Sequence, residues 1–204
     1  MIPERRHVLR SVSLALAGAA LGLVAMRAFA GPRDREESSV EFSPFDLLAA
    51  EADVSGDSNM AAFLSMIRKA EGTAGPNGYR MIFGGQLFSG FADHPRVRVP
   101  FTQTDGKPNV STAAGAYQFV VRTWDDLAEK LSLPDFSPAS QDRGAVELIR
   151  ERGALDDVRE GRFETALSRV ATVWASLPGS PYPQPSRSLD FVISAYEQAG
   201  GSYA

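Results

Sequence analysis

One interruption in the helical periodicity of this sequence constrains its fold more than any other feature. Residues 73–110 show no helical repeat and carry many glycines and prolines, with short apolar runs at Met81–Phe83 and Val97–Phe101. This pattern is typical of short strands joined by turns and long loops, whereas the segments on both sides place apolar residues at helical spacing. We therefore predict an α+β domain that is mostly helical and contains one small β-hairpin region.

The expected helices are bounded by capping residues, prolines and glycines. The first is expected from Ser58 to Gly72, and the second over Ala113–Leu131, capped by Ser111 or Thr112. A third begins at Ser137-Pro138 and ends at Gly153, and a short helix covers Leu155–Arg159. Two more are expected, from Phe163 to Leu177 with Pro178 as the stop, and from Leu189 to Tyr196 with Gly200-Gly201 at the end.

The first 30 residues have the organisation of an export signal. Arg5, Arg6 and Arg10 form a basic head, and Ser11–Met26 follows without a charged residue. As a helix this run spans roughly 24 Å, which is shorter than the ~30 Å hydrocarbon core of a bilayer. Ala28-Phe29-Ala30 then offers a small-residue cleavage site, so residues 1–30 are expected to be a secretory signal peptide.

An uncleaved signal anchor, in which residues 8–26 hold the chain at a membrane, remains an alternative to cleavage, and a buried core helix is a third. The basic head resembles a twin-arginine signal, which implies export in the folded state to the periplasm or the cell wall. Residues 31–58 are polar and acidic and are expected to be a linker, and residues 59–204 are expected to form the folded domain.

Composition excludes several classes of site. The sequence contains no cysteine and two histidines, so it has no disulfide framework, no thiol nucleophile, no cysteine-bound zinc or iron–sulfur cluster, and no His-rich metal centre. A carboxylate-only metal site stays open on this ground, but we expect no metal and no cofactor. The net charge is −4, which argues against a nucleic-acid partner held by phosphate contacts.

One carboxylate lies on an apolar helix face. Glu71 follows Met60 by eleven residues and Leu64 by seven, and at ~100° per residue both offsets come within about 20° of whole turns. Burial and the partial negative charge of the helix end both oppose ionisation there. A carboxyl kept protonated near neutral pH is what a general acid requires. Periodicity alone equally allows a Glu71 that reaches solvent or pairs with an arginine.

A set of short motifs, specific in order and spacing, resembles the lambda-type phage lysozymes, or endolysins, over residues 59–204. These motifs are Glu71-Gly72-Thr73, Gly78-Tyr79, Gly84-Gly85, Leu87-Phe88, Asp93-His94-Pro95, Gly115-x-Tyr117-Gln118, Leu133-x-Asp135-Phe136-Ser137-Pro138, Ser140-Gln141-Asp142, Glu151-Arg152-Gly153-Ala154-Leu155, Trp174-Ala175-Ser176-Leu177-Pro178-Gly179 and Tyr182-x-Gln184.

This resemblance implies a lysozyme-like fold and cleavage of the MurNAc–GlcNAc β-1,4 bond of peptidoglycan by lytic transglycosylation. Glu71 matches the position of the single glutamate that acts first as acid and then as base, leaving a 1,6-anhydromuramic end. An internal nucleophile needs no activated water, whereas hydrolytic glycosidases usually use two carboxylates. Asp93 is the best candidate for a second carboxylate, although it and Asp105 both lie in sequences that favour turns.

Four further residues are candidates for contact with the sugar rings. The amide of Gln118 could pair with an N-acetyl group, and Tyr117, Tyr79 and Tyr182 could provide aromatic surfaces, although each tyrosine could equally serve packing. Trp124 and Trp174 fit apolar helix faces and are expected in the core. Gln118 and Tyr117 are placed near the start of the second predicted helix.

This chain departs from the phage pattern in its N-terminal extension and in a Pro- and Gly-bearing stretch, Pro100–Asn109, expected to be a loop between the hairpin and the second helix. A hydrolytic muramidase of the same fold and a non-catalytic peptidoglycan-binding module are the alternative functions. We expect a monomer that acts on glycan strands. Whether it serves phage lysis, wall growth or a secretion apparatus stays open at this point.

Overall fold

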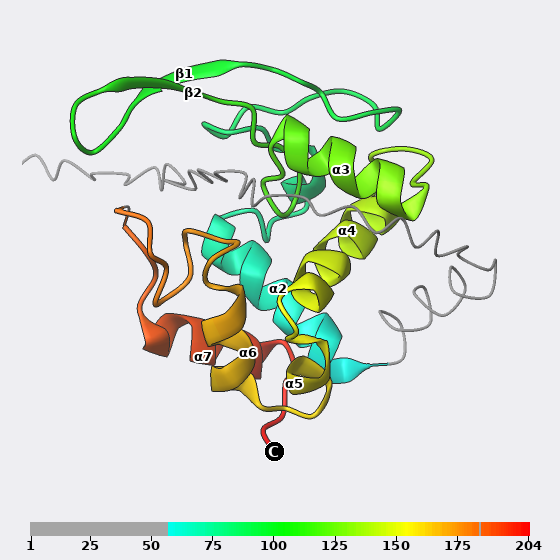
Figure 1. The fold of residues 1–204 in the computed structure, drawn as a ribbon, viewed down its shortest axis with the longest axis vertical. Helices are drawn as coiled ribbons and strands as arrows, with labels where there is room; N and C mark the ends of the chain where they lie inside the picture. Colours follow the sequence, from blue (N-terminus) through cyan, green and yellow to red (C-terminus); the bar gives the residue numbers. More distant parts are fainter. Residues whose placement is uncertain (1–56, 184) are drawn as a thin grey trace, which may run out of the picture.

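The computed structural model describes residues 57–183 and 185–204. The expected export signal, including residues 8–26, and almost all of the expected linker lie outside these residues. Within the part that is described, no helix combines the length and the apolar character needed to cross a bilayer. Helix and strand labels below are those drawn in Figure 1, where the helical labels begin at α2.

Helix α2 (Ser58–Glu71) runs through the middle of the molecule and contacts α4, α5 and α7 (Figure 1). The carboxylate of Asp57 accepts hydrogen bonds from the first backbone N–H groups of the helix, at Asn59 and Met60. Gly72 ends the helix in a left-handed conformation with φ 77°, which glycine adopts without a Cβ penalty. The first predicted helix is thus confirmed at both ends, and Glu71 is its last residue.

Three other predicted helices are confirmed, with boundaries close to the expected ones. Helix α4 (Pro138–Glu151) is capped by the Ser137 hydroxyl and contacts α3 and α5. Helix α5 (Leu155–Arg159) follows it, and α7 (Leu189–Gln198) packs along α2 near the end of the chain.

The second predicted helix is wrong in its first half, because α3 covers only Val121–Leu131. Before it, Ala114 and Phe119 exchange two backbone hydrogen bonds across a tight turn. Gly115 has φ 79° and Gln118 has φ 50° inside this turn, and left-handed residues cannot belong to a right-handed helix. Gln118 and Tyr117 therefore lie on an irregular loop rather than at a helix start.

Helix α6 (Phe163–Val170) is likewise shorter than the predicted helix, which continued to Leu177. Residues 171–177 form successive turns, with Val173 N–H bonded to Val170 O and Leu177 N–H bonded to Trp174 O. The side chains of Trp174 and Ser176 hydrogen-bond to groups on other segments. These tertiary contacts hold the segment in turns despite its helical spacing of apolar residues.

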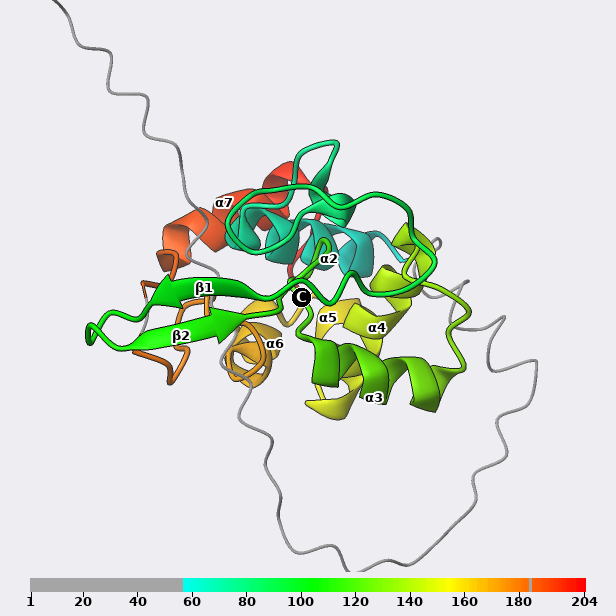
Figure 2. The same ribbon diagram turned by 90° about the horizontal axis from the view of Figure 1, so that it is seen from above.

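The sheet is one antiparallel hairpin of β1 (Val99–Thr102) and β2 (Pro108–Ser111), with Val99 opposite Ser111 and Thr102 opposite Pro108. It occupies most of the stretch expected to be a loop, Pro100–Asn109, so that prediction is wrong. The run Met81–Phe83 contributes only isolated bridges, and η1 (Gly78–Arg80) is a short 3-10 turn before it. Figure 2 shows the hairpin extending beyond the helices on one side, opposite α3.

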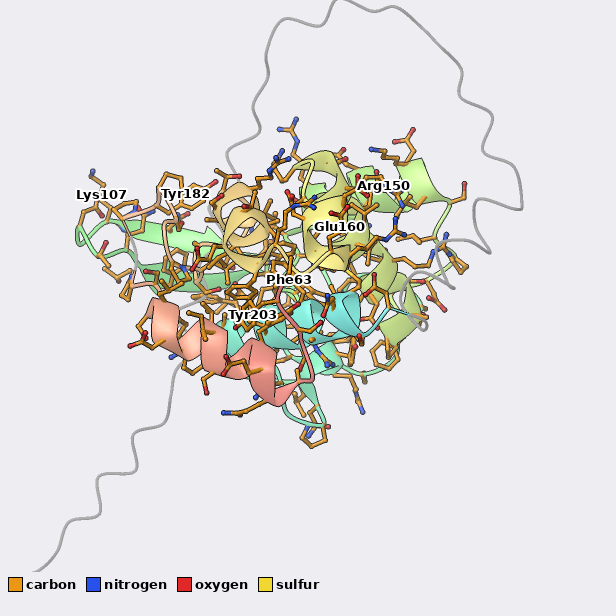
Figure 3. All side chains as sticks on the ribbon, turned by 90° about the horizontal axis from the view of Figure 1, so that it is seen from below. Phe63, Lys107, Arg150, Glu160, Tyr182 and Tyr203 are labelled. Carbon is orange, nitrogen blue, oxygen red and sulfur yellow. The ribbon has the colours of Figure 1, made fainter. Side chains whose placement is uncertain are left out.

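The core surrounds α2. The Phe63 ring, labelled in Figure 3, lies 5.9 Å from the Phe163 ring and 6.3 Å from the Tyr196 ring, and the three rings join α2, α6 and α7. On the other side of the molecule Trp124 packs edge-on against Phe136 at 4.5 Å. Trp124 and Trp174 are both buried, as expected.

Candidate active site

The carboxyl group of Glu71 is buried at the C-terminal end of α2, and 1% of the residue is exposed. The hydroxyl of Ser176 donates a hydrogen bond of 2.6 Å to Oε1. The other oxygen, Oε2, has no hydrogen-bond partner among the described residues. When the carboxyl is protonated, Oε2 is the oxygen free to carry the proton, because Oε1 accepts from Ser176.

Burial raises the pKa of Glu71 to about 7, against an ordinary value of 4.5. The Ser176 hydroxyl and the positive charge of Arg187 both lower this pKa, but burial outweighs them because the desolvated anion loses its hydration. No carboxylate in residues 57–183 or 185–204 contributes to the shift. Glu71 is therefore partly protonated and partly ionised near neutral pH.

Arg187, which lies shortly before α7, connects the segment that carries Ser176 to the end of α2. The backbone N–H of Arg187 donates to Ser176 O at 2.7 Å. The Arg187 side chain donates from Nε to Ala70 O at 3.2 Å. Ser176 and Arg187 were given no role in the sequence analysis, because each meets α2 through a contact that no local pattern reveals.

The loop 114–119 is hydrogen-bonded to residues that lie two positions in sequence from Glu71 and from Ser176. Thr73, two residues after Glu71, donates from its hydroxyl to Ala116 O, and the Trp174 indole N–H donates to Tyr117 O at 3.2 Å. Gln118 is buried, and its Nε2 donates to Gly115 O at 2.9 Å and to Met81 O at 3.3 Å. The amide nitrogen of Gln118 is therefore engaged by two backbone carbonyls, and the amide oxygen is the remaining hydrogen-bonding group of that side chain.

Tyr79 and Tyr117 meet at one carboxylate. Their hydroxyls donate to the same oxygen of Asp142, at 2.8 Å and 2.6 Å, and Arg68 donates to the Tyr79 hydroxyl at 3.0 Å. Burial raises the pKa of the Asp142 carboxyl, and the two tyrosine hydroxyls oppose that shift. The arrangement joins α2, η1, the loop and α4, so both hydroxyls are engaged in holding these segments together.

Tyr182 lies apart from that cluster, close to the hairpin. Figure 3 shows it on the same side of the molecule as Lys107 at the hairpin turn, and the Thr104 hydroxyl donates to Pro183 O at 3.0 Å. The Tyr182 hydroxyl donates to Thr172 O at 3.0 Å, and its ring is partly exposed. The structure thus brings Tyr79 and Tyr117 together but places Tyr182 elsewhere.

The two aspartates considered as second carboxylates have other partners. Asp93 accepts from the His94 backbone N–H and pairs with Arg96, and these contacts hold the pKa of Asp93 below its ordinary value. Asp105 pairs with Lys107 across the hairpin turn. Their expected roles in turns are confirmed, and neither shares a partner with Glu71 in the described part of the chain. No three His, Asp or Glu side chains there are grouped so that they could hold a metal ion.

Replacing Gly115 with alanine is expected to destabilise the protein by about 3 kcal/mol. A Cβ there would lie 2.2 Å from Gln141 Oε1, which accepts from Ala116 N–H. Left-handed strain costs roughly 1–2 kcal/mol, and the disturbed buried hydrogen bond roughly 1–3 kcal/mol more. Urea unfolding of G115A would measure the loss.

The matched control is G85A. Gly85 has φ 87°, but no atom lies within 4 Å of the place that an added methyl group would take, so only the strain applies. Equal losses of stability in G85A and G115A would contradict the packing role assigned to Gly115 and Gln141.

The comparisons with known proteins agree with this geometry. The sequence model of the Endolysin family matches residues 61–203. The chain belongs to the Endolysin family. It is 44% identical to the endolysin of Escherichia phage P2 over 154 residues, covering 70% of this chain and 93% of that protein. It is 41% identical to the endolysin of Escherichia phage lambda over 148 residues, covering 69% of this chain and 90% of that protein.

Among solved structures, the fold is similar to bacteriophage lambda lysozyme complexed with a chitohexasaccharide, with a TM-score of 0.67 and 40% identity over 72% of this chain and 97% of that one. A second structure of the lysozyme from bacteriophage lambda matches with a TM-score of 0.64 and 39% identity. The predicted family and the lysozyme-like fold are thus confirmed. Membership in this family supports an enzyme that cleaves glycosidic bonds of peptidoglycan.

Proposed function

We propose that this chain is an exported peptidoglycan lytic transglycosylase that cleaves the MurNAc–GlcNAc β-1,4 bond and leaves 1,6-anhydromuramic ends. The observation that carries this proposal is the buried Glu71 carboxyl, whose pKa is raised to about 7 with no contribution from a second carboxylate in the described residues. A group that must give and then take a proton works best when its pKa lies near the operating pH.

In the first step Glu71 is the acid. The proton on its unpaired Oε2 passes to the glycosidic oxygen, the bond from that oxygen to C1 of MurNAc breaks, and positive charge develops at C1. Ser176 acts as a positioning residue, because its hydroxyl donates to Oε1 and stabilises the carboxylate that forms.

In the second step the same carboxylate is the base. It takes the proton of the C6 hydroxyl of the same MurNAc as that oxygen bonds to C1, which restores protonated Glu71 and closes the anhydro ring. No water enters the reaction, so a carboxylate that activates water is not required. Asp93, the best candidate for a second carboxylate, pairs with Arg96 at the surface, which supports a single acid.

Gln118 and Tyr182 are proposed to contact the sugar rings. The Gln118 amide oxygen can accept from an N-acetyl N–H, and the partly exposed Tyr182 ring offers an apolar surface to a pyranose ring. Tyr117 is fully buried and Tyr79 half-buried, with both hydroxyls on Asp142, so we assign them to the support of the loop that carries Gln118 rather than to direct contact.

Export and domain organisation complete the proposal. Residues 1–30 carry the basic head, apolar run and small-residue site of an export signal, and residues 31–58 are the tether, whose last two residues, Asp57 and Ser58, cap and begin α2. Residues 59–204 then form the catalytic domain, which acts as a monomer on glycan strands in the periplasm or at the cell wall.

Replacing Ser176 with alanine is expected to move the alkaline limb of the pH–rate profile upward by roughly 1–2 pH units. The hydroxyl lowers the pKa of Glu71, and a hydrogen bond to a charged group contributes ~1.5–3 kcal/mol. Without it Glu71 stays protonated to higher pH. The profile of kcat/KM against pH on purified peptidoglycan measures this, with S168A as the control, since the exposed Ser168 hydroxyl donates only within its own helix, to Thr165 O, among the described residues. An unmoved limb in S176A would refute the positioning role.

Product analysis tests the proposed function. Purified peptidoglycan is digested with the full chain, and the released muropeptides are analysed by mass spectrometry. The proposal expects anhydro ends, each lighter by one water than a reducing end. Reducing ends alone would identify a hydrolytic muramidase, and no products from a folded protein that binds peptidoglycan would favour a non-catalytic module.

A further inference from the structure

Arg187 is held near Glu71 by two hydrogen bonds to backbone carbonyl groups. Its Nε donates to the carbonyl of Ala70, the residue before Glu71, and its own N–H donates to the carbonyl of Ser176. Because the Ser176 hydroxyl in turn donates to Glu71, the guanidinium is fixed relative to the carboxyl that breaks the bond.

The guanidinium nevertheless remains open to a ligand. Arg187 is exposed, and one face of its guanidinium lies over the Phe191 ring, 5.0 Å from the ring centre. Among the residues that the structure describes, its Nε bond to Ala70 and this ring contact hold the side chain, and no carboxylate forms an ion pair with it. A stacked guanidinium with free N–H groups at its edge matches the geometry of a carboxylate.

The positive charge of Arg187 only partly offsets the effect of burial on the pKa of Glu71. Arg187 exerts the smallest of the three influences on the pKa of Glu71, and burial keeps that pKa raised in spite of it. The protonated form of Glu71, which the first step requires, carries no charge to neutralise Arg187, so this exposed cation can attract an anionic group of the substrate.

The proposed substrate carries such a group next to the bond that is cleaved. MurNAc differs from GlcNAc by a lactyl ether, whose carboxyl is either free or linked to a peptide stem that bears carboxylates of its own. A polymer of GlcNAc alone has none of these charges. We infer that Arg187 is a specificity-determining residue that pairs with a carboxylate on the muramic side chain, on the lactyl group or on the stem. This inference rests on the proposed function.

Two matched pairs of glycan strands test the inference with the full chain. The first pair carries peptide stems with carboxylates either free or converted to methylamides. The second pair is stem-free, with the lactyl carboxyl either free or converted to its methylamide. All four keep the glycosidic bond and the C6 hydroxyl, so the chemistry is unchanged. The wild-type protein is expected to prefer the free-carboxylate member of one pair by at least ~10-fold in kcat/KM, and that pair identifies the source of the carboxylate.

Two variants separate recognition from structure. R187M removes the charge and the Nε donor, and is expected to abolish the preference. R187K also loses the Nε bond to Ala70 but keeps the charge, so it should retain most of the preference. A merely structural Arg187 would lower cleavage of all four strands by one factor in both variants.

The outcomes are distinguishable. Equal kcat/KM within both pairs for the wild-type protein, or a preference that persists unchanged in R187M, overturns the inference while leaving the proposed function intact. Failure of the folded wild-type protein to cleave any of the four strands overturns the proposed function itself. If R187M does not fold, R187Q takes its place, because it also removes the charge and is likewise expected to abolish the preference.

Discussion

The E71Q variant is expected to cleave peptidoglycan with a kcat lower by roughly 10³-fold or more. Glutamine has the size and shape of glutamic acid, but its amide neither delivers a proton to the glycosidic oxygen nor takes one from the C6 hydroxyl. Because one group serves both steps in this account, no other side chain compensates. The Ser176 hydroxyl can still donate to the amide oxygen, so the site should keep its structure.

The release of soluble muropeptides by equal amounts of wild-type and E71Q protein measures this loss. D93N is the matched control, because Asp93 is exposed and paired with Arg96, and its kcat should equal that of the wild-type protein. Full activity in E71Q would remove Glu71 from the mechanism. A loss in D93N as large as that in E71Q would point to a second catalytic carboxylate.

The stability of the wild-type protein relative to E71Q is expected to fall by roughly 3 kcal/mol as the pH rises from about 4.5 to about 8. In the unfolded chain Glu71 titrates near its ordinary pKa of 4.5, whereas in the folded state its pKa is about 7. Between these values the folded state binds more protons than the unfolded state, so rising pH favours unfolding. The decline ends once the pH has passed the folded pKa.

Urea unfolding of both proteins at a series of pH values measures this difference. The use of E71Q as reference cancels the titration of every other group, since glutamine does not ionise. A difference in unfolding free energy that stays constant over the whole range would show that Glu71 titrates alike in both states. This result would contradict the conclusion that burial raises the pKa of Glu71 in the folded state.

Much of the helical framework could be predicted because its boundaries are local. Asp57 and Gly72 define α2, and Ser137 with Pro138 starts α4, through contacts that span a few residues. The position of Glu71 on the apolar face follows in the same way from its spacing to Met60 and Leu64, whereas the burial of its carboxyl group is established only by the structure.

The errors arise where distant contacts override local spacing. Apolar residues in 113–120 fit a helix, but Gly115 and Gln118 adopt left-handed conformations that close a turn. In the hairpin, Pro100 and Pro108 lie in the two strands, and proline in a short run argues against a strand unless the strand lies at an edge. A two-stranded sheet consists only of edge strands, which the sequence alone does not disclose.

The candidate site was predicted only in part for the same reason. Glu71 could be found from periodicity, but its partner Ser176 is 105 residues away in the sequence. Arg187 reaches the carbonyl of Ala70 over 117 residues. Neither lies in a pattern with chemical meaning of its own, so their roles emerge only when the chain folds them onto the end of α2.

The source of the oxygen atom at the new glycan end tests the central claim most directly. Peptidoglycan is digested by the full chain in water enriched in ¹⁸O, and the muropeptides are analysed at once by mass spectrometry. If Glu71 directs the C6 hydroxyl onto C1, the products carry anhydro ends without ¹⁸O, and E71Q yields none of them. Incorporation of one ¹⁸O atom at each cleaved MurNAc would show that water is the nucleophile, and would contradict the account of a single acid that needs no second carboxylate.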